Sequence, residues 1–226
     1  MRVRLRAARS AALALLVLSA GACATAQRSP AGPPARLVTR EAEVLVLSGG
    51  RSYFFENRHP HCLAYGLEGE WEFAAQRAAL RTTDRRRFVG VVLQDSGAFP
   101  GSGGGDLVTR AITHIIADTE REWGRGVHVK VEAFSSLRPG AVLLEFEDVT
   151  VTPELAARMT RPSPPAVGQR VQLPLRVVAP FDSTLVMVVT ALEVGDAQAI
   201  ARTLEVTEDP QCWRRTILER FPGAQP

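Results

Sequence analysis

The sequence predicts an α+β domain in which helices cover a mainly antiparallel sheet. Short segments of β-branched and aromatic residues, several with apolar and polar residues in alternation, recur between turn residues, as is typical of antiparallel strands. One long amphipathic segment at residues 106–123 interrupts them, and further helical segments lie toward the C-terminus. This order of strands, helix, more strands and final helices indicates an α+β sandwich.

Five extended segments precede the long helix, and their β-branched and aromatic residues favour strands. The expected strands span residues 37–47, 51–56, 62–67, 70–73 and 88–93. In the fourth segment, Trp71 and Phe73 stand two residues apart, so both side chains should lie on one face of the strand.

Residues 106–123 carry the clearest helical pattern. Apolar positions recur there at steps of three and four residues and form one stripe. The stripe consists of Val108, Ala111, Ile112, Ile115, Thr119 and Trp123. Asp106 is a natural N-cap, and Gly124 is a natural stop. The helix should therefore pack on the sheet along this stripe.

The remaining elements are expected to be four strands and three shorter helices. The strands span residues 128–134, 141–146, 170–178 and 184–190. The helices span residues 153–159, 197–206 and 213–221. Asp196 should cap the second of these helices, which would turn Ile200 and Leu204 inward.

Residues 53–73 read as an aromatic strand, Asn-x-x-Pro, a short strand and Gly-Glu-Trp, and the strand Phe-Val-Gly-Val-Val follows. Together with the long helix, the later strand pairs and the helix after Asp196, this order resembles the PsbP-like family. The resemblance implies an α/β/α sandwich, often lipid-anchored and extracytoplasmic, with a scaffold or accessory role rather than a reaction.

The first residues form an export signal. Four arginines, at positions 2, 4, 6 and 9, precede an apolar run at residues 11–20, and small residues then lead to Cys23. The apolar run is much shorter than the roughly 20 residues that a membrane-spanning helix needs. These features predict a cleaved signal peptide over residues 1–22.

Residues 18–23 resemble the lipobox of bacterial lipoproteins, although Ala20 and Gly21 depart from its commoner residues. The resemblance implies that Cys23 becomes a lipidated N-terminus, and Ala24 after it implies sorting to the outer membrane. Ordinary cleavage at an A-x-A site, at residues 22–24 or 24–26, is the alternative. If Cys23 is lipidated, residues 23–36 are the lipidated cysteine and a Pro/Ala/Gly-rich tether, and residues 37–226 form a single α+β domain.

The charge argues against a nucleic-acid partner. Residues 1–22 contain four of the 27 basic residues and no acidic residue, so the mature chain has 23 basic and 24 acidic residues. A net charge of −1 offers no basic footprint for a phosphate backbone.

Cys62 and Cys212 are the other cysteines, and in an oxidising compartment they predict a disulfide. A closed loop of about 150 residues would stabilise the fold by roughly 5 kcal/mol in the chain-entropy model. A redox or metal-binding thiol is the alternative. His59 and His61 next to Cys62 could supply zinc or copper ligands, but a surface loop leading into a strand is the favoured explanation, and no metal site is predicted.

No strong catalytic or cofactor motif occurs. The glycine-rich residues 101–105 lack the Gly-Lys-Ser/Thr of a P-loop, and no G-x-S-x-G elbow accompanies His114 and Asp118, which could touch on the long helix. The sequence therefore predicts a non-enzymatic, lipid-anchored accessory or interaction protein of the bacterial envelope, without a cofactor. Its expected partners are the membrane, through its lipid, and an envelope protein. A periplasmic small-ligand or lipid-binding module is the alternative, followed by a hydrolase that uses His114 or the His59/His61 segment.

Overall fold

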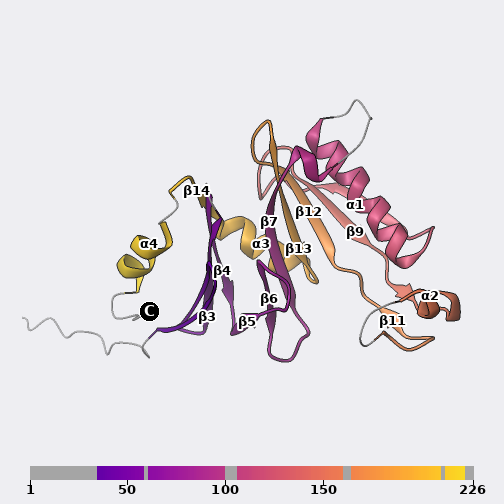
Figure 1. Ribbon diagram of the computed structural model, residues 1–226, viewed down its shortest axis with the longest axis horizontal. Helices are drawn as coiled ribbons and strands as arrows, with labels where there is room; N and C mark the ends of the chain where they lie inside the picture. Colours follow the sequence, from indigo (N-terminus) through magenta and orange to yellow (C-terminus); the bar gives the residue numbers. More distant parts are fainter. Residues whose placement is uncertain (1–34, 59–60, 100–105, 160–163, 210–211, 222–226) are drawn as a thin grey trace, which may run out of the picture. The chain divides into compact units, whose positions relative to one another are not determined.

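The computed structural model describes residues 35–58, 61–99, 106–159, 164–209 and 212–221, and within these ranges it leaves out the side chains of residues 58, 212, 213 and 218. The described residues belong to one compact unit. All of its strand pairs are antiparallel, and strands outnumber helices, as Figure 1 shows. The prediction of a mixed α+β fold dominated by antiparallel sheet is therefore confirmed.

The first sheet has five strands in the order β1-β2-β3-β4-β14. They are β1 (Arg36–Arg40), β2 (Glu43–Ser48), β3 (Arg51–Arg58), β4 (His61–Glu68) and β14 (Glu205–Thr207). The single strand predicted at residues 37–47 is wrong, because Glu41 adopts a φ of 52° and turns the chain into the β1–β2 hairpin. A non-glycine residue seldom takes this left-handed conformation, so the sequence gives no turn signal there.

The second sheet has seven strands in the order β5-β6-β7-β13-β12-β9-β8. They are β5 (Trp71–Phe73), β6 (Ala79–Thr82), β7 (Phe88–Asp95), β13 (Leu185–Ala191), β12 (Leu175–Pro180), β9 (Val142–Phe146) and β8 (Val129–Ala133). The strand predicted at residues 170–178 is in fact two. β11 (Arg170–Val171) pairs with β10 (Val149–Thr150), and β12 joins the large sheet only after Pro174.

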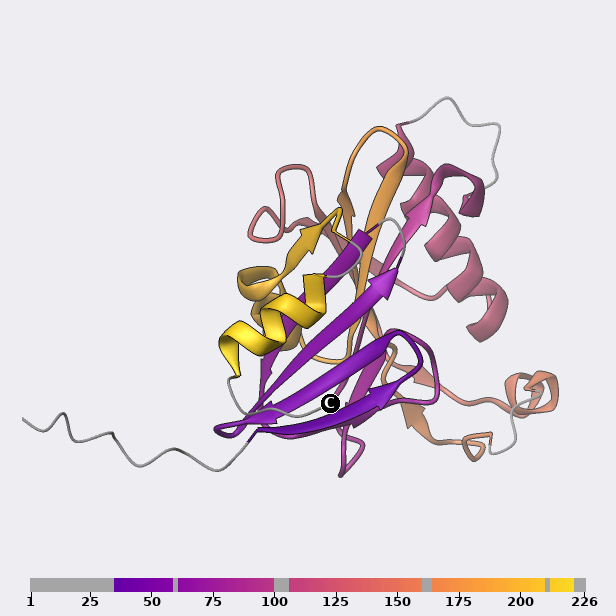
Figure 2. The ribbon, with the colours of Figure 1, turned by 60° about the vertical axis from the view of Figure 1, so that its left-hand side comes forward.

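The two sheets face each other across the largest core. Its buried side chains include Leu45, Phe54 and Leu67 of the first sheet and Val89, Val177 and Val189 of the second. Helix α3 (Val194–Thr203) adds Ala197 and Ile200 to the same core. The views in Figures 1 and 2 agree in placing α3 beside both sheets. Trp71 and Phe73 both contribute to this core, as the sequence predicts.

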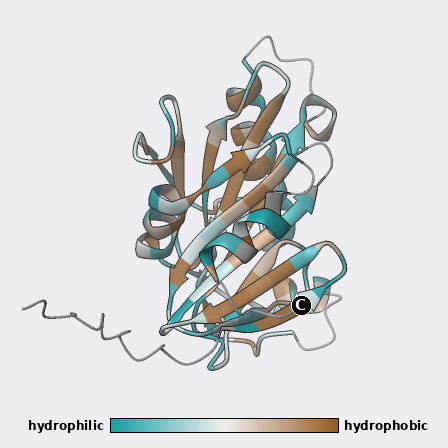
Figure 3. Ribbon diagram, turned by 90° about the vertical axis from the view of Figure 1, so that its left-hand side faces the viewer, coloured by the Kyte–Doolittle hydropathy of each residue, from teal (hydrophilic) through white to brown (hydrophobic). Residues whose placement is uncertain are grey.

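A helix covers the other face of each sheet. Ile217 of α4 (Cys212–Arg220) packs on Phe55 and Ala64 of the first sheet. In Figure 3 the strands are mostly hydrophobic, whereas α4 in front of them is largely hydrophilic. Helix α1 (Leu107–Trp123) packs its apolar stripe, with Ala111 at the centre, on the second sheet. The layers thus run helix, sheet, sheet, helix.

The long helix matches its prediction closely. Asp106 caps α1 by accepting a hydrogen bond from the Thr109 amide at 2.9 Å, and Gly124 ends it with a φ of 106°. The helix predicted at residues 197–206 instead begins at Val194 and ends at Thr203, because residues 205–207 pair with β4 as β14. Asp196 is therefore not the cap but a buried residue of the first turn, paired with Arg87. The short helix α2 (Pro153–Arg158) lies where expected.

Candidate functional site

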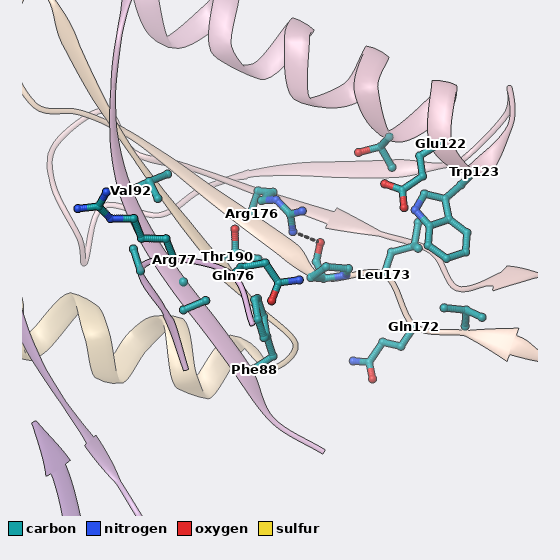
Figure 4. Close-up of a pocket in the computed structure, with 16 residues that line it drawn as sticks. Gln76, Arg77, Phe88, Val92, Glu122, Trp123, Gln172, Leu173, Arg176 and Thr190 are labelled. Carbon is teal, nitrogen blue, oxygen red and sulfur yellow. Dashed lines mark hydrogen bonds between the residues drawn. The ribbon is translucent and has the colours of Figure 1, made fainter. Parts of the chain in front are cut away.

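A pocket of about 450 Å³ opens on the face of the second sheet that carries α1. Strands β6, β7, β13 and β12 form its floor, and the C-terminal end of α1 and residues 171–174 form its walls. Figure 4 shows the side chains that line it. A volume of this size lies within the range of small-molecule sites.

The floor of the pocket is one row of cross-strand neighbours. Ala79 of β6 lies opposite Gly90 of β7, Gly90 opposite Thr190 of β13, and Thr190 opposite Arg176 of β12. Alternate residues of these strands, such as Val89 and Val177, point to the opposite face and fill the core between the sheets. The floor and that core are therefore built by alternating positions of the same strands.

Gly90 helps to make the space above the floor. A Cβ atom at this position would lie 3.4 Å from the Ala78 carbonyl oxygen and 3.6 Å from the Ala79 Cβ, which are ordinary contact distances. The backbone thus does not require glycine here, and a larger side chain would extend into the pocket that Gly90 lines.

Aromatic and aliphatic side chains form the walls. Trp123, the last residue of α1, packs with Leu173 and Leu155 in a small core of its own. Phe88 and Val92 of β7 line the pocket on either side of Gly90. Gln76, Gln172 and Thr119 add polar groups to the lining. The pocket therefore offers both apolar surface and hydrogen-bonding groups.

Arg176 is the most unusual residue of the site. Its Nη1 donates hydrogen bonds to the carbonyl oxygens of Pro174 at 2.9 Å and Leu175 at 3.2 Å, and Figure 4 places its guanidinium group among the lining side chains. Burial lowers the pKa of Arg176 to about 10, because a desolvated guanidinium holds its charge less favourably. At pH 7 the group still carries its positive charge.

No carboxylate forms an ion pair with Arg176, although Glu122 lines the same pocket. All 24 acidic residues of the chain lie in the described ranges, and none of them forms an ion pair with Arg176. Each of the three fully buried carboxylates, by contrast, lies within 4 Å of an arginine: Glu43 with Arg40, Glu56 with Arg77, and Asp196 with Arg87. Arg77, which also lines the pocket, has its Nε 3.5 Å from an oxygen of Glu56.

The two cysteines expected to pair lie on neighbouring elements. Cys62 is buried in β4, and its sheet neighbour is Thr207 of β14. Cys212 begins α4, and its side chain lies outside the described residues. The disulfide between them stays a prediction, as does lipidation of Cys23, which also lies outside the described residues.

The histidine cluster gains no further ligands from the described residues. His59 lies outside them, and His61 packs edge-on against Phe181, with ring centroids 5.3 Å apart. Nowhere in the described ranges do three or more His, Cys, Asp or Glu side chains gather as metal ligands would.

The contact expected between His114 and Asp118 is confirmed, with His114 Nε2 lying 3.2 Å from an Asp118 oxygen. His114 also packs edge-on against Phe99, and among the described residues no serine hydroxyl hydrogen bonds to it. The glycine-rich residues 101–105 lie outside the described ranges. The geometry of a serine nucleophile and its base is thus not assembled in the described part of the chain.

Reasoning from the sequence missed Arg176 and Gly90, although both carry a signal. Arg176 is a lone charge in the apolar strand Leu-Arg-Val-Val-Ala-Pro, and Gly90 interrupts the strand Phe-Val-Gly-Val-Val. A glycine inside a strand often marks the close approach of a ligand or of another backbone. What the sequence does not show is that the two residues lie in one cross-strand row.

Within the described ranges, no helix has both the length and the hydrophobicity needed to cross a bilayer. No protein-family model matches the chain, and neither the curated proteins nor the solved structures include a significant match.

Proposed function

We propose that this protein is a lipid-anchored binding protein of the bacterial envelope whose pocket, between the second sheet and α1, holds a small ligand. The pocket and the uncompensated charge of Arg176 carry this proposal. Of the functions that the sequence predicts, they favour the small-ligand module over a purely accessory protein.

The pocket has the features of a binding site. Its volume is about 450 Å³, its walls combine Trp123, Phe88 and Leu173 with a few polar groups, and its floor belongs to a rigid sheet. Small-molecule sites combine apolar walls with a few well-placed polar groups in this way.

The extracytoplasmic setting is part of the proposal. The export signal and Cys23 support it, and so does the position of the other two cysteines. Thr207, the sheet neighbour of Cys62, precedes Cys212 by only a few residues, and α4 packs on the same sheet. A disulfide between them would fasten α4 to β4.

The PsbP-like resemblance also stays a proposal. Antiparallel strands with helices on the outer faces are compatible with it, whereas the division of the strands into two facing sheets is a difference from a single covered sheet. The resemblance supports an accessory role and names no ligand.

The test is to purify the mature protein from its own envelope and to identify bound small molecules by native mass spectrometry. We expect a retained ligand in the natural protein and its loss in Gly90→Leu, because the added side chain fills the pocket. Gly195→Leu is the matched control, since an added Cβ at Gly195 meets nothing within 4 Å. Equal ligand retention in both variants would contradict the proposal.

A further inference from the structure

Arg176 lines the pocket, and two of its guanidinium nitrogens have no hydrogen-bond acceptor among the described residues. Both of its hydrogen bonds within the described residues use Nη1, which leaves Nε and Nη2 without an acceptor there. The N–H groups of these two nitrogens point in the same direction, and their spacing matches the two oxygens of a carboxylate.

The charged groups of the lining bear on the charge of the ligand. Arg77 lies 3.5 Å from Glu56, and Glu122 also lines the pocket but forms no ion pair with Arg176. A ligand with one negative charge would neutralise Arg176, but a dianion would bring a second negative charge into a lining that already contains Glu122, which is unfavourable.

The lining beyond Arg176 is suited to an apolar group. From Arg176 the floor passes over Thr190 to Gly90, where no side chain stands, and Phe88 lies two residues from Gly90 on the same strand. Figure 4 shows Trp123 at the other end of the pocket, beyond Leu173. A ligand whose acid group lies at Arg176 would thus place its body over Gly90, next to Phe88.

We propose, building on the ligand-binding function above, that the pocket recognises small monocarboxylic acids with an apolar or aromatic body. Nε and Nη2 of Arg176 donate to the two carboxylate oxygens, and the body of the acid lies over Gly90.

The probes are two acids and their neutral amides: phenylbutyrate with phenylbutyramide, and octanoate with octanamide. Isothermal titration of the ligand-stripped mature protein at pH 7 should show each acid binding about ten- to a hundredfold more tightly than its amide, as expected of a charge-assisted pair of hydrogen bonds. In Arg176→Gln the affinity for the acids should fall to that for the amides, while the affinity for the amides stays unchanged.

Arg176→Lys keeps the positive charge but lacks the planar guanidinium, so it should lose most of the preference for acids over amides. This variant gives a second measurement if Arg176→Gln does not fold. Amides that bind the natural protein as tightly as the acids, or Arg176→Lys with the full preference, would overturn carboxylate recognition and leave the pocket as a binding site. Tighter binding of phenyl phosphate than of phenylbutyrate would overturn the monoanion class.

Other outcomes would contradict ligand binding by the pocket itself. If neither acids nor amides bind, or if Gly90→Leu binds them as well as the natural protein does, both the inference and the proposed pocket function are wrong. Binding of the acids that is lost in Gly90→Leu and kept in Gly195→Leu supports both.

Discussion

Arg176 is a residue that we expect to weaken the fold. Its lowered pKa means that folding moves a charged group into surroundings that favour the charge less than water does. Residues that weaken a fold in this way are characteristic of functional sites, where activity opposes stability.

We expect Arg176→Met to raise the free energy of unfolding of the ligand-free protein by about 1–2 kcal/mol at pH 7, because an apolar side chain avoids the desolvation of an unpaired charge. Urea denaturation of both proteins measures the difference, with Arg170→Met, an exposed arginine paired with Asp148, as the control that should change little. A variant less stable than the natural protein would contradict the desolvation argument.

The stability difference between the natural protein and Arg176→Met should depend on pH. Burial lowers the folded-state pKa of Arg176 to about 10, well below its ordinary value, so between these two values the unfolded chain binds more protons than the folded one. The stability of the natural protein then rises with pH relative to the variant. The advantage of Arg176→Met should therefore be smaller at about pH 10.5 than at pH 7.

An ion pair between the buried Asp196 and the partly exposed Arg87 links helix α3 to the second sheet. Asp196 is 3% exposed and accepts a hydrogen bond from Arg87 Nε at 3.1 Å, and the Arg87 guanidinium lies 4.8 Å from the centre of the Trp71 ring. This contact links the first turn of α3 to the residue before β7 and to β5.

Loss of the Arg87 guanidinium should destabilise the fold more than loss of the Asp196 charge. We expect Arg87→Met to lower the free energy of unfolding by about 2–4 kcal/mol, because it leaves Asp196 buried without its cation. Asp196→Asn should cost less, about 1–2 kcal/mol, since its amide oxygen can still accept from Arg87. Thermal unfolding compares them with Arg81→Met, which breaks a partly exposed pair with Glu72 and should change little. Equal effects of all three variants would argue against this role of the buried pair.

Elements defined by local signals could be predicted from the sequence, and elements defined by distant partners could not. Helix α1 carries its stripe, its cap and its stop within residues 106–124, and the structure agrees with all three. Residues 205–207 continue a helical pattern but form β14, because β4 offers them a free edge. The division of the strands into two facing sheets likewise depends on contacts between residues far apart in sequence.

For the whole molecule, the proposed export signal leads to a prediction about the covalent state of the native protein. We expect the intact mass of the native protein to match a chain that begins at a lipidated Cys23 and lacks the two hydrogens lost when Cys62 and Cys212 join. Triacylation would hold the protein on a membrane, since each buried methylene contributes about 0.8 kcal/mol.

Cys23→Ser is the matched variant for this prediction. It should move the protein from the membrane fraction to the soluble extracytoplasmic fraction and leave the disulfide mass difference unchanged. A native protein that still begins at Met1, with free thiols, would contradict both the anchor and the oxidising compartment.

The pleat of the second sheet has a consequence for protein engineering. Even-numbered residues of its central strands, such as 88, 90, 176 and 190, surround the pocket, while the odd-numbered 89, 91, 177 and 189 hold the sheets together. If the pocket binds a ligand as proposed, its specificity could be redesigned at the even positions that line it, because the opposite side of each strand keeps its packing. The even-numbered Val178, Val186 and Val188 pack under α1 and would be kept. One face of the second sheet would thus tolerate substitutions that change the pocket, while the other face keeps the packing between the two sheets.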